Sequence, residues 1–77
     1  MDINEFIEKF GEQFDDLNGE VLAADTPFRE IDSWSSLTAL SIIAMVDEEY
    51  GVQLTGDDMR SSQTIEDVFK KVAAKKG

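Results

Sequence analysis

The sequence predicts an all-α fold: a four-helix bundle with three longer helices, one short third helix and a long loop between the first two helices. Apolar residues recur at spacings of three and four in three separate stretches, as they do on the buried face of an amphipathic helix. No stretch shows the alternating pattern of a strand. A length of 77 residues with 42% hydrophobic and 31% charged residues is typical of one folded domain, here residues 1–77.

The first helix is expected to run from about residue 3 to 16. Asp2 is a suitable N-cap residue, and Asn18-Gly19 is a suitable stop because both residues tolerate left-handed backbone angles. The apolar stripe between them consists of Ile3, Phe6, Ile7, Phe10, Phe14 and Leu17.

A long loop is expected to follow, because the sequence shows no sustained periodicity from there to Trp34 and contains its single proline, Pro27. Loops of this length are uncommon in compact domains unless they are functional. Scattered apolar residues suggest that this loop is held across the core, namely Val21, Leu22, Phe28, Ile31 and Trp34.

The second helix is expected to begin in the serine cluster of residues 33–36, to continue to Tyr50 and to stop at Gly51. Its apolar residues are too numerous for one face. A helical wheel places Ala39, Ile42, Ile43, Val46 and Tyr50 on one arc, which we assign to the core. The opposite arc holds Leu37, Leu40, Ser41, Ala44 and Glu48, with Asp47 beside Leu40.

This opposite arc, apolar and edged with acids, is typical of a docking surface for a basic partner. Two other interpretations remain open from the pattern alone. A second copy of the chain could cover the arc, or the wheel could be rotated by one position.

The last two helices are shorter. Residues 55–59 predict a turn followed by the short third helix. Thr64 then caps a final helix, with Asp67 placed three residues on to complete a capping box. Its apolar stripe consists of Ile65, Val68, Phe69, Val72 and Ala73, and lysines follow where the helix dipole favours them.

The charge of the chain excludes several classes of partner. All 17 acids and only three of the seven bases lie in residues 1–69, so this part carries a net charge of −14. Such a surface repels nucleic acid and anionic membranes and attracts basic proteins. From composition alone, the acidity could equally serve only to keep a small protein in solution. No apolar stretch approaches the roughly 18 residues of a membrane span, and the acids near the N-terminus exclude a secretory signal. We therefore expect a cytoplasmic protein without membrane insertion.

The residue types present argue against an enzyme. The sequence has no cysteine and no histidine, so the usual nucleophile, general base and commonest metal ligand are missing. A serine nucleophile would need a lysine or a carboxylate as base, and no basic residue lies close to Ser36 in sequence. The pairs Asp15-Asp16 and Asp57-Asp58 lack the alternating ligand spacing of a calcium loop, so we expect no metal site.

The start of the second helix carries a further signal. Free backbone amides and the positive end of the helix dipole make a natural seat for a phosphate, and a serine there could carry a phosphodiester. On physical grounds alone, helix capping is the better explanation of these serines, because serine is a common capping residue and needs no modification to account for it.

The stretch DSWSSLTALSIIAMVDEEYGVQL resembles the prosthetic-group region of acyl carrier proteins of the stand-alone bacterial type. In both, a serine is followed by leucine, here Ser36-Leu37, then by a helix that closes in acids and an aromatic residue, here Asp47-Glu48-Glu49-Tyr50. The resemblance covers most of the chain and includes the long loop. It implies an acyl-carrier-like bundle in which Ser36 receives 4′-phosphopantetheine covalently from a phosphopantetheinyl transferase.

The resemblance also implies a function. The thiol of the arm would hold acyl groups as thioesters and deliver them to acyl-transferring, synthase or ligase enzymes with basic docking patches. Leu37, Leu40, Ser41, Ala44, Asp47 and Glu48 would contact those partners, with the carrier a monomer. Among the three serines, only Ser36 has leucine next to it and the helix at the family's spacing, which places it ahead of Ser33 and Ser35.

This sequence departs from the family pattern at three positions that are often acidic: Ser35, Thr38 and Ser41. Because charged rims set partner choice, these changes suggest a specialised pathway rather than housekeeping fatty-acid synthesis. The alternative to a carrier is a non-covalent acidic helical interaction module, an adaptor or inhibitor that uses the same surface.

Overall fold

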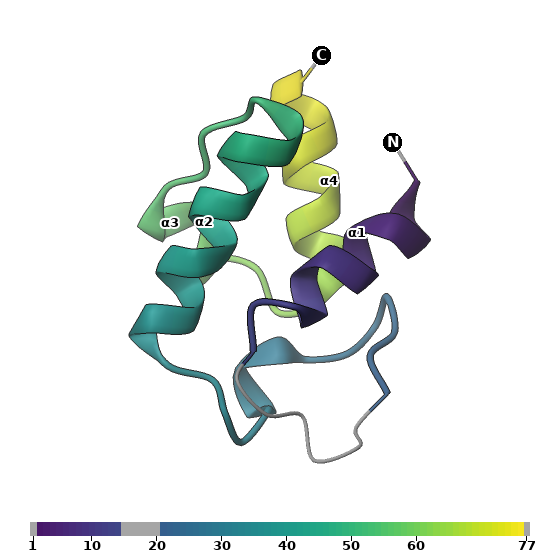
Figure 1. The fold of residues 1–77 in the computed structure, drawn as a ribbon, viewed down its shortest axis with the longest axis vertical. Helices are drawn as coiled ribbons and strands as arrows, with labels where there is room; N and C mark the ends of the chain where they lie inside the picture. The colour runs from purple at the N-terminus through teal and green to yellow at the C-terminus, as the bar shows by residue number, and fades with distance from the viewer. Residues whose placement is uncertain (1, 15–20, 77) are drawn as a thin grey trace.

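The computed structural model describes residues 2–14 and 21–76, and within them the four predicted helices are present (Figure 1). They are α1 (Ile3–Gly11), α2 (Ser36–Tyr50), α3 (Gly56–Arg60) and α4 (Ile65–Lys76), with a 3₁₀ turn at Phe28–Glu30 in the long loop. The fold class predicted from the sequence is confirmed, since the described part of the chain is helical and has no strand.

The helices α2 and α4 lie side by side and rise in the same direction in Figure 1. They can do so because residues 51–64, which include α3, carry the chain back along α2 before α4 begins. Helix α1 slants across this pair and contacts both. The long loop passes below α1 at one end of the molecule and then rises into the start of α2.

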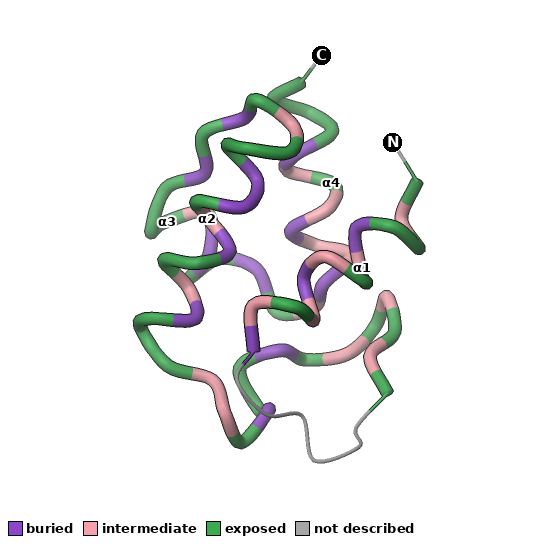
Figure 2. Tube along the Cα trace, in the orientation of Figure 1, coloured by how far each residue is buried: buried purple, intermediate pink, exposed green. Residues whose placement is uncertain are grey.

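The core is rich in aromatic side chains. Phe6 and Phe10 of α1 are fully buried, and Phe10 meets Phe28 of the loop with ring centroids 5.5 Å apart. Phe28 in turn packs against Trp34, with ring centroids 5.0 Å apart. Buried residues alternate with exposed ones along each helix, as a thin bundle requires (Figure 2). The buried aliphatic residues come mainly from α2 and α4 and from the connection between α2 and α3, namely Ile42, Val46, Val52, Leu54, Ile65, Val68 and Val72.

The first helix is shorter than predicted. It was expected to reach residue 16, but α1 ends at Gly11 and the next residues form tight turns, with Gln13 N donating to Phe10 O and Phe14 N to Gly11 O. Glycine is unfavourable in the interior of a helix, so Gly11 favours an end there. The two hydrogen bonds that follow join residues three apart, the 3₁₀ pattern that commonly closes an α-helix. Phe14 still packs in the core from this turn. The stop predicted at Asn18-Gly19 lies outside the described residues.

The long loop is held across the core, as predicted. Phe28 and Ile31 are buried, whereas Val21 is exposed. The loop is also bonded to the start of α4, because Ile65 N donates to Thr26 O and Glu66 N donates to Ala24 O at 2.8 Å. These bonds satisfy two amides that a helix start leaves without partners, so the loop acts as a backbone cap for α4.

Three other helix ends agree with the sequence. Ser35, from the predicted serine cluster, is the N-cap of α2, Gly51 ends that helix with φ of 67°, and Thr64 and Asp67 exchange hydrogen bonds at the start of α4. At α3, Thr55 and Asp58 form a capping box, which was not predicted from the sequence. No described helix is long and apolar enough to cross a membrane.

Candidate functional site

The start of α2 separates the roles of the three clustered serines. The Ser35 side chain caps the helix by accepting a hydrogen bond from Thr38 N at 3.3 Å. The Ser33 hydroxyl oxygen is buried and has no hydrogen-bond partner among the described residues. Ser36 is the first residue of the helix, is exposed, and its hydroxyl makes no hydrogen bond within the described chain. The Ser36 oxygen is therefore both accessible and uncommitted.

The backbone around Ser36 suits a phosphate ester. The amide of Thr38 is bonded to the Ser35 side chain and that of Ala39 to the Ser35 carbonyl, whereas the amides of Ser36 and Leu37 find no acceptor among the described residues. Free amides and the positive end of the helix dipole favour a negative group at this position. A phosphodiester on the Ser36 oxygen would thus lie where the helix already stabilises negative charge.

Thr38 corrects an expectation drawn from the sequence. It was treated as a surface position whose lack of charge would alter partner recognition, but the structure leaves it only 6% exposed. Its hydroxyl contacts Ser35 Oγ at 3.2 Å and donates to the carbonyl of Ser33 at 3.3 Å. Thr38 therefore fastens the turn before α2, and an acid could not be placed there without burying its charge.

The arc of α2 assigned to partner binding lies at the surface. Leu37 is 75% exposed and Leu40 62%, which is unusual for residues of this size in a small domain. The polar and small members of the arc are exposed as well, namely Ser41, Ala44, Asp47 and Glu48. The described residues thus leave an apolar stripe with an acidic end on the outside of α2.

The core-facing arc is rotated slightly from its predicted position. Ile42 and Val46 are buried as expected, but Thr38 and Met45 are buried too, while Ala39, Ile43 and Tyr50 are only partly buried. The shift arises because α1 packs against the Met45 side of α2, and Ala39 and Ile43 face a groove toward α3.

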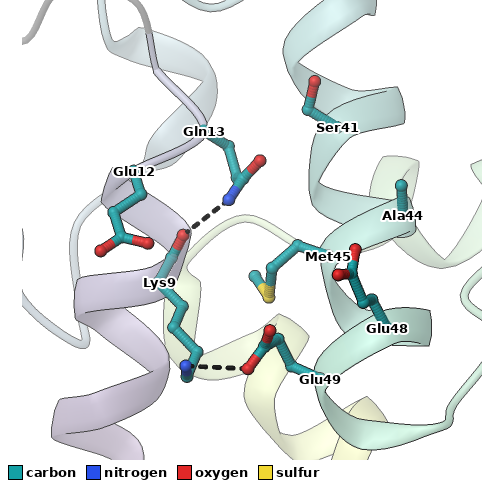
Figure 3. Close-up of a pocket in the computed structure, with 8 residues that line it drawn as sticks. All are labelled: Lys9, Glu12, Gln13, Ser41, Ala44, Met45, Glu48 and Glu49. Atoms are coloured by element: carbon teal, nitrogen blue, oxygen red, sulfur yellow. Dashed lines mark hydrogen bonds and ion pairs between the residues drawn. The ribbon is translucent and has the colours of Figure 1, made fainter.

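A hollow of about 270 Å³ lies between α1 and the exposed arc of α2 (Figure 3). Ser41, Ala44 and Glu48 of the arc line one side of it, and Lys9 of α1 and Glu12, just after that helix, line the other. Lys9 Nζ donates to Glu49 Oε1 at 2.9 Å, a bond that ties α1 to α2 and raises the pKa of the lysine. The hollow is therefore edged by carboxylates that continue the acidic end of the arc.

On the other side of α2, an open groove of about 400 Å³ lies next to Ser36. Its apolar lining comes from Trp34, Ala39, Leu40, Ile43 and Met59. Sequence reasoning missed this groove because it joins the loop, α2 and α3, which are far apart along the chain. The available signal was Arg29 and Arg60, two of the three bases in residues 1–69, which both line it.

Of the two acid pairs considered as metal ligands, one is paired with basic side chains and the other lies outside the described residues. Asp57 pairs with Arg60, and Asp58 pairs with Lys75 at 2.8 Å. Asp15-Asp16 lies outside the described residues. Among the residues that are described, no group of three acid, histidine or cysteine side chains gathers as a metal site would require.

Comparison with known proteins agrees with this geometry. A family model described as a phosphopantetheine attachment site matches residues 4–71, which is most of the chain. Members of this family carry 4′-phosphopantetheine as a covalently attached group. Searches of curated proteins and of solved structures give no significant match. The chain therefore belongs to the phosphopantetheine attachment site family, that of the acyl carrier proteins.

Proposed function

We propose that this protein is an acyl carrier that holds acyl groups as thioesters on a phosphopantetheine arm at Ser36 and delivers them to partner enzymes. The observation that carries the proposal is the contrast among the clustered serines. Ser33 has a buried oxygen, Ser35 is committed to capping, and Ser36 offers a free hydroxyl at the helix start.

The attachment chemistry follows from this placement. A phosphopantetheinyl transferase would bring coenzyme A to the Ser36 hydroxyl. The serine oxygen would form the new phosphodiester bond, adenosine 3′,5′-bisphosphate would leave, and the serine proton would pass to the transferase. When bound, the arm supplies the thiol that this cysteine-free chain lacks. The free amides of Ser36 and Leu37 would stabilise the negative phosphodiester.

The role of the carrier itself is then non-catalytic. Without histidine or cysteine, the chain lacks a thiolate nucleophile and an imidazole base to act on a thioester. Its own residues would position the arm and present a docking surface, and its partners would supply the chemistry. A cytoplasmic location and a monomeric state belong to the same proposal.

The partner surface that we propose consists of Leu37, Leu40, Ser41, Ala44, Asp47 and Glu48. The exposed leucines would enter an apolar recess on the partner, close to the attachment point. The acids further along α2 would pair with basic residues, and the carboxylates at the hollow beside α1 extend that negative area. Acyl-transferring, synthase or ligase enzymes with basic patches fit this description.

A specialised pathway is favoured by the neutral start of α2. The first turn of this helix holds no acid, and the neutral residues Ser35 and Ser41 stand at exposed positions where related carriers often have carboxylates. Thr38 is buried and does not alter the surface. Partners would therefore meet an apolar and hydroxyl-bearing surface near Ser36, and charge pairing would begin only at Asp47.

The direct test is loading of the apo protein with coenzyme A by a broad-specificity phosphopantetheinyl transferase, followed by intact mass. We expect one arm on the wild type, one arm on Ser33→Ala and Ser35→Ala, and none on Ser36→Ala. The first two variants are matched controls, since each removes a neighbouring hydroxyl. Ser35→Ala also removes a helix cap and should lower stability by about 0.5–2 kcal/mol, which a melting curve would show separately.

The alternative function is a non-covalent acidic interaction module, an adaptor or inhibitor. It would use the same exposed stripe but would not need Ser36. Absence of loading in the wild type would favour this alternative, and loading that persists in Ser36→Ala would show that the attachment point is elsewhere.

A further inference from the structure

The groove beside Ser36 combines an apolar lining with two cations. Trp34, Ile43 and Met59 contribute apolar surface, and Arg29 and Arg60 also line it. Its volume of about 400 Å³ falls in the range of small-ligand sites, roughly 300–1,000 Å³. An apolar groove alone would accept any short hydrocarbon chain, so the arginines are the feature that needs a separate explanation.

Arg29 is held in a fixed position. Its Nη1 donates to the carbonyl of Met59 at 2.9 Å and to that of Arg60 at 3.2 Å, and its guanidinium carbon lies 5.4 Å from the centre of the Phe28 ring. Carbonyl acceptors orient the group but do not neutralise its charge. Because it is already ordered, the guanidinium would lose little further side-chain entropy on binding a ligand.

Arg29 also keeps its charge available. Among the described residues no carboxylate lies within ion-pair distance of it, although the chain has 17 acids. No hydrogen bond is made by its Nε or Nη2 in the described part of the chain. Arg60 contributes less, since its guanidinium pairs with Asp57. The two free nitrogens of Arg29 present the planar fork that binds a carboxylate with two hydrogen bonds.

We propose that the groove selects acyl groups that end in a carboxylate, with the chain against the apolar lining and the carboxylate on Arg29. This inference rests on the proposed carrier function, since it places the cargo of the arm at Ser36 in the adjoining groove. A purely aliphatic cargo would gain nothing from a cation that lines the groove. A carboxylate-ended cargo would gain an anchor on a surface that otherwise repels anions.

The test compares two arms that differ only at the end of the cargo. The full chain is loaded at Ser36 from hexanoyl-coenzyme A or from adipoyl-coenzyme A, which have equal chain lengths, and is melted in low salt. On an acidic protein, one more negative charge should lower the melting temperature unless a cation receives it. The inference predicts the opposite sign, with the adipoyl form melting roughly 2–5 °C above the hexanoyl form.

Variants then locate the effect. Arg29→Gln should abolish the adipoyl advantage, Arg29→Lys should keep part of it because charge remains without the fork, and Arg60→Gln should reduce it less. Lys70→Gln is the matched control, since it removes one positive charge on α4 from a lysine that does not line the groove. Trp34 is the single tryptophan, so a shift of its emission on adipoyl loading reports directly on the groove.

The possible outcomes separate the inference from the proposed function. If neither arm attaches to Ser36, the carrier function and the inference fail together. If both arms attach but the adipoyl form melts at or below the hexanoyl form, the inference is wrong and the carrier function stands. An equal stabilisation of both forms that is lost in Arg29→Gln would show that Arg29 binds the phosphodiester of the arm, which also overturns the inference.

Discussion

Single hydroxyl groups at the start of α2 illustrate how neighbours of the same residue type take different roles. Ser35 bonds to the helix amide, the Ser33 oxygen is enclosed, and Thr38 fastens the turn between them. The Ser35 and Thr38 hydroxyls are thus committed to hydrogen bonds, and the Ser33 hydroxyl is buried. Of these four residues, only Ser36 presents an uncommitted hydroxyl at the surface. The hydrogen bonds of its neighbours hold the turn in place and so fix the position of Ser36 for a partner enzyme.

At the same scale, the two faces of α2 predict opposite responses to a new charge. Leu40 is 62% exposed, so Leu40→Asp should change the free energy of unfolding by no more than about 0.5 kcal/mol, yet it should strongly slow acyl transfer to a partner. Val46 is fully buried, so Val46→Asp would bury an unpaired carboxylate at a cost of several kcal/mol and should unfold the domain. Circular dichroism and melting curves measure both effects.

A charge reversal at the end of the same arc provides the matched measurement for docking. Glu48→Lys should slow association with a basic partner and weaken the dependence of that rate on salt, because rim charges act mainly on encounter.

A folded Val46→Asp together with an unfolded Leu40→Asp would mean that the proposed docking surface belongs to the core instead.

At the scale of elements, the start of α4 is bonded both by its own residues and by the long loop. The Asp67 carboxylate accepts from the amides of Gln63 and Thr64, and the loop carbonyls of Ala24 and Thr26 accept from the next two amides. The amides of Gln63 and Thr64 stabilise the ionised form of Asp67 and lower its pKa below the usual value of 3.8. The loop and α4 are thus joined in one unit.

This lowered pKa predicts an acid-sensitive contribution to stability. The folded state favours the ionised Asp67, so its contribution is complete above the unfolded pKa of about 3.8 and is lost as the pH falls through the lower folded value. Asp67→Asn should therefore be less stable than the wild type at neutral pH, with the difference shrinking below pH 3.8. Urea unfolding at several pH values tests this, with Asp32→Asn as a control for an exposed loop acid. A constant difference at all pH values would contradict the assignment.

The elements that sequence periodicity predicted well are those with strong local signals. The serine cluster that contains Ser35, the stop at Gly51 and the cap Thr64 mark two helices, because caps act within a few residues. The end of α1 was misplaced because apolar spacing continues through Phe14, although the chain there forms turns rather than helix. Periodicity reports which side chains face the core and cannot by itself say whether the backbone between them is helical.

Features that depend on tertiary contact were beyond the sequence. The loop was expected to cross the core, but its backbone bonds to α4 join residues about 40 positions apart, and nothing local specifies them. The groove beside Ser36 likewise needs Trp34, Ile43 and Met59 to meet. The lysines of α4 were assigned to the helix dipole, yet Lys76 donates to Tyr50 O and Lys75 to Gln53 O, so they also bond the end of α2 and the segment after it.

At the scale of the whole molecule, net repulsion opposes the compact state. The chain measures 35 × 23 × 21 Å and carries a net charge of −10, so like charges lie within reach of one another across the fold. At 0.01 M salt the screening length is about 30 Å, so charges interact across the whole molecule. At 0.1 M it is about 10 Å, so only neighbouring charges interact strongly. Five ion pairs among the described residues offset part of this repulsion.

We therefore expect the melting temperature to rise as salt is added from about 0.01 M to 0.1 M, with most of the gain in that interval. Salt also weakens the favourable ion pairs, but the excess of acids makes relief of repulsion the larger effect. Scanning calorimetry across this range gives the answer. A melting temperature that stays level or falls would show that the ion pairs outweigh the repulsion.

The central claim is that Ser36 carries a phosphopantetheine arm, and the most direct measurement is mass spectrometry of the protein purified from its native host. The account predicts an intact mass higher than that of the bare chain by one phosphopantetheine, and a fragment spectrum that places the added mass on Ser36. An intact mass equal to that of the unmodified chain in cells that make the transferase, or an arm located on Ser33 or Ser35, would contradict it.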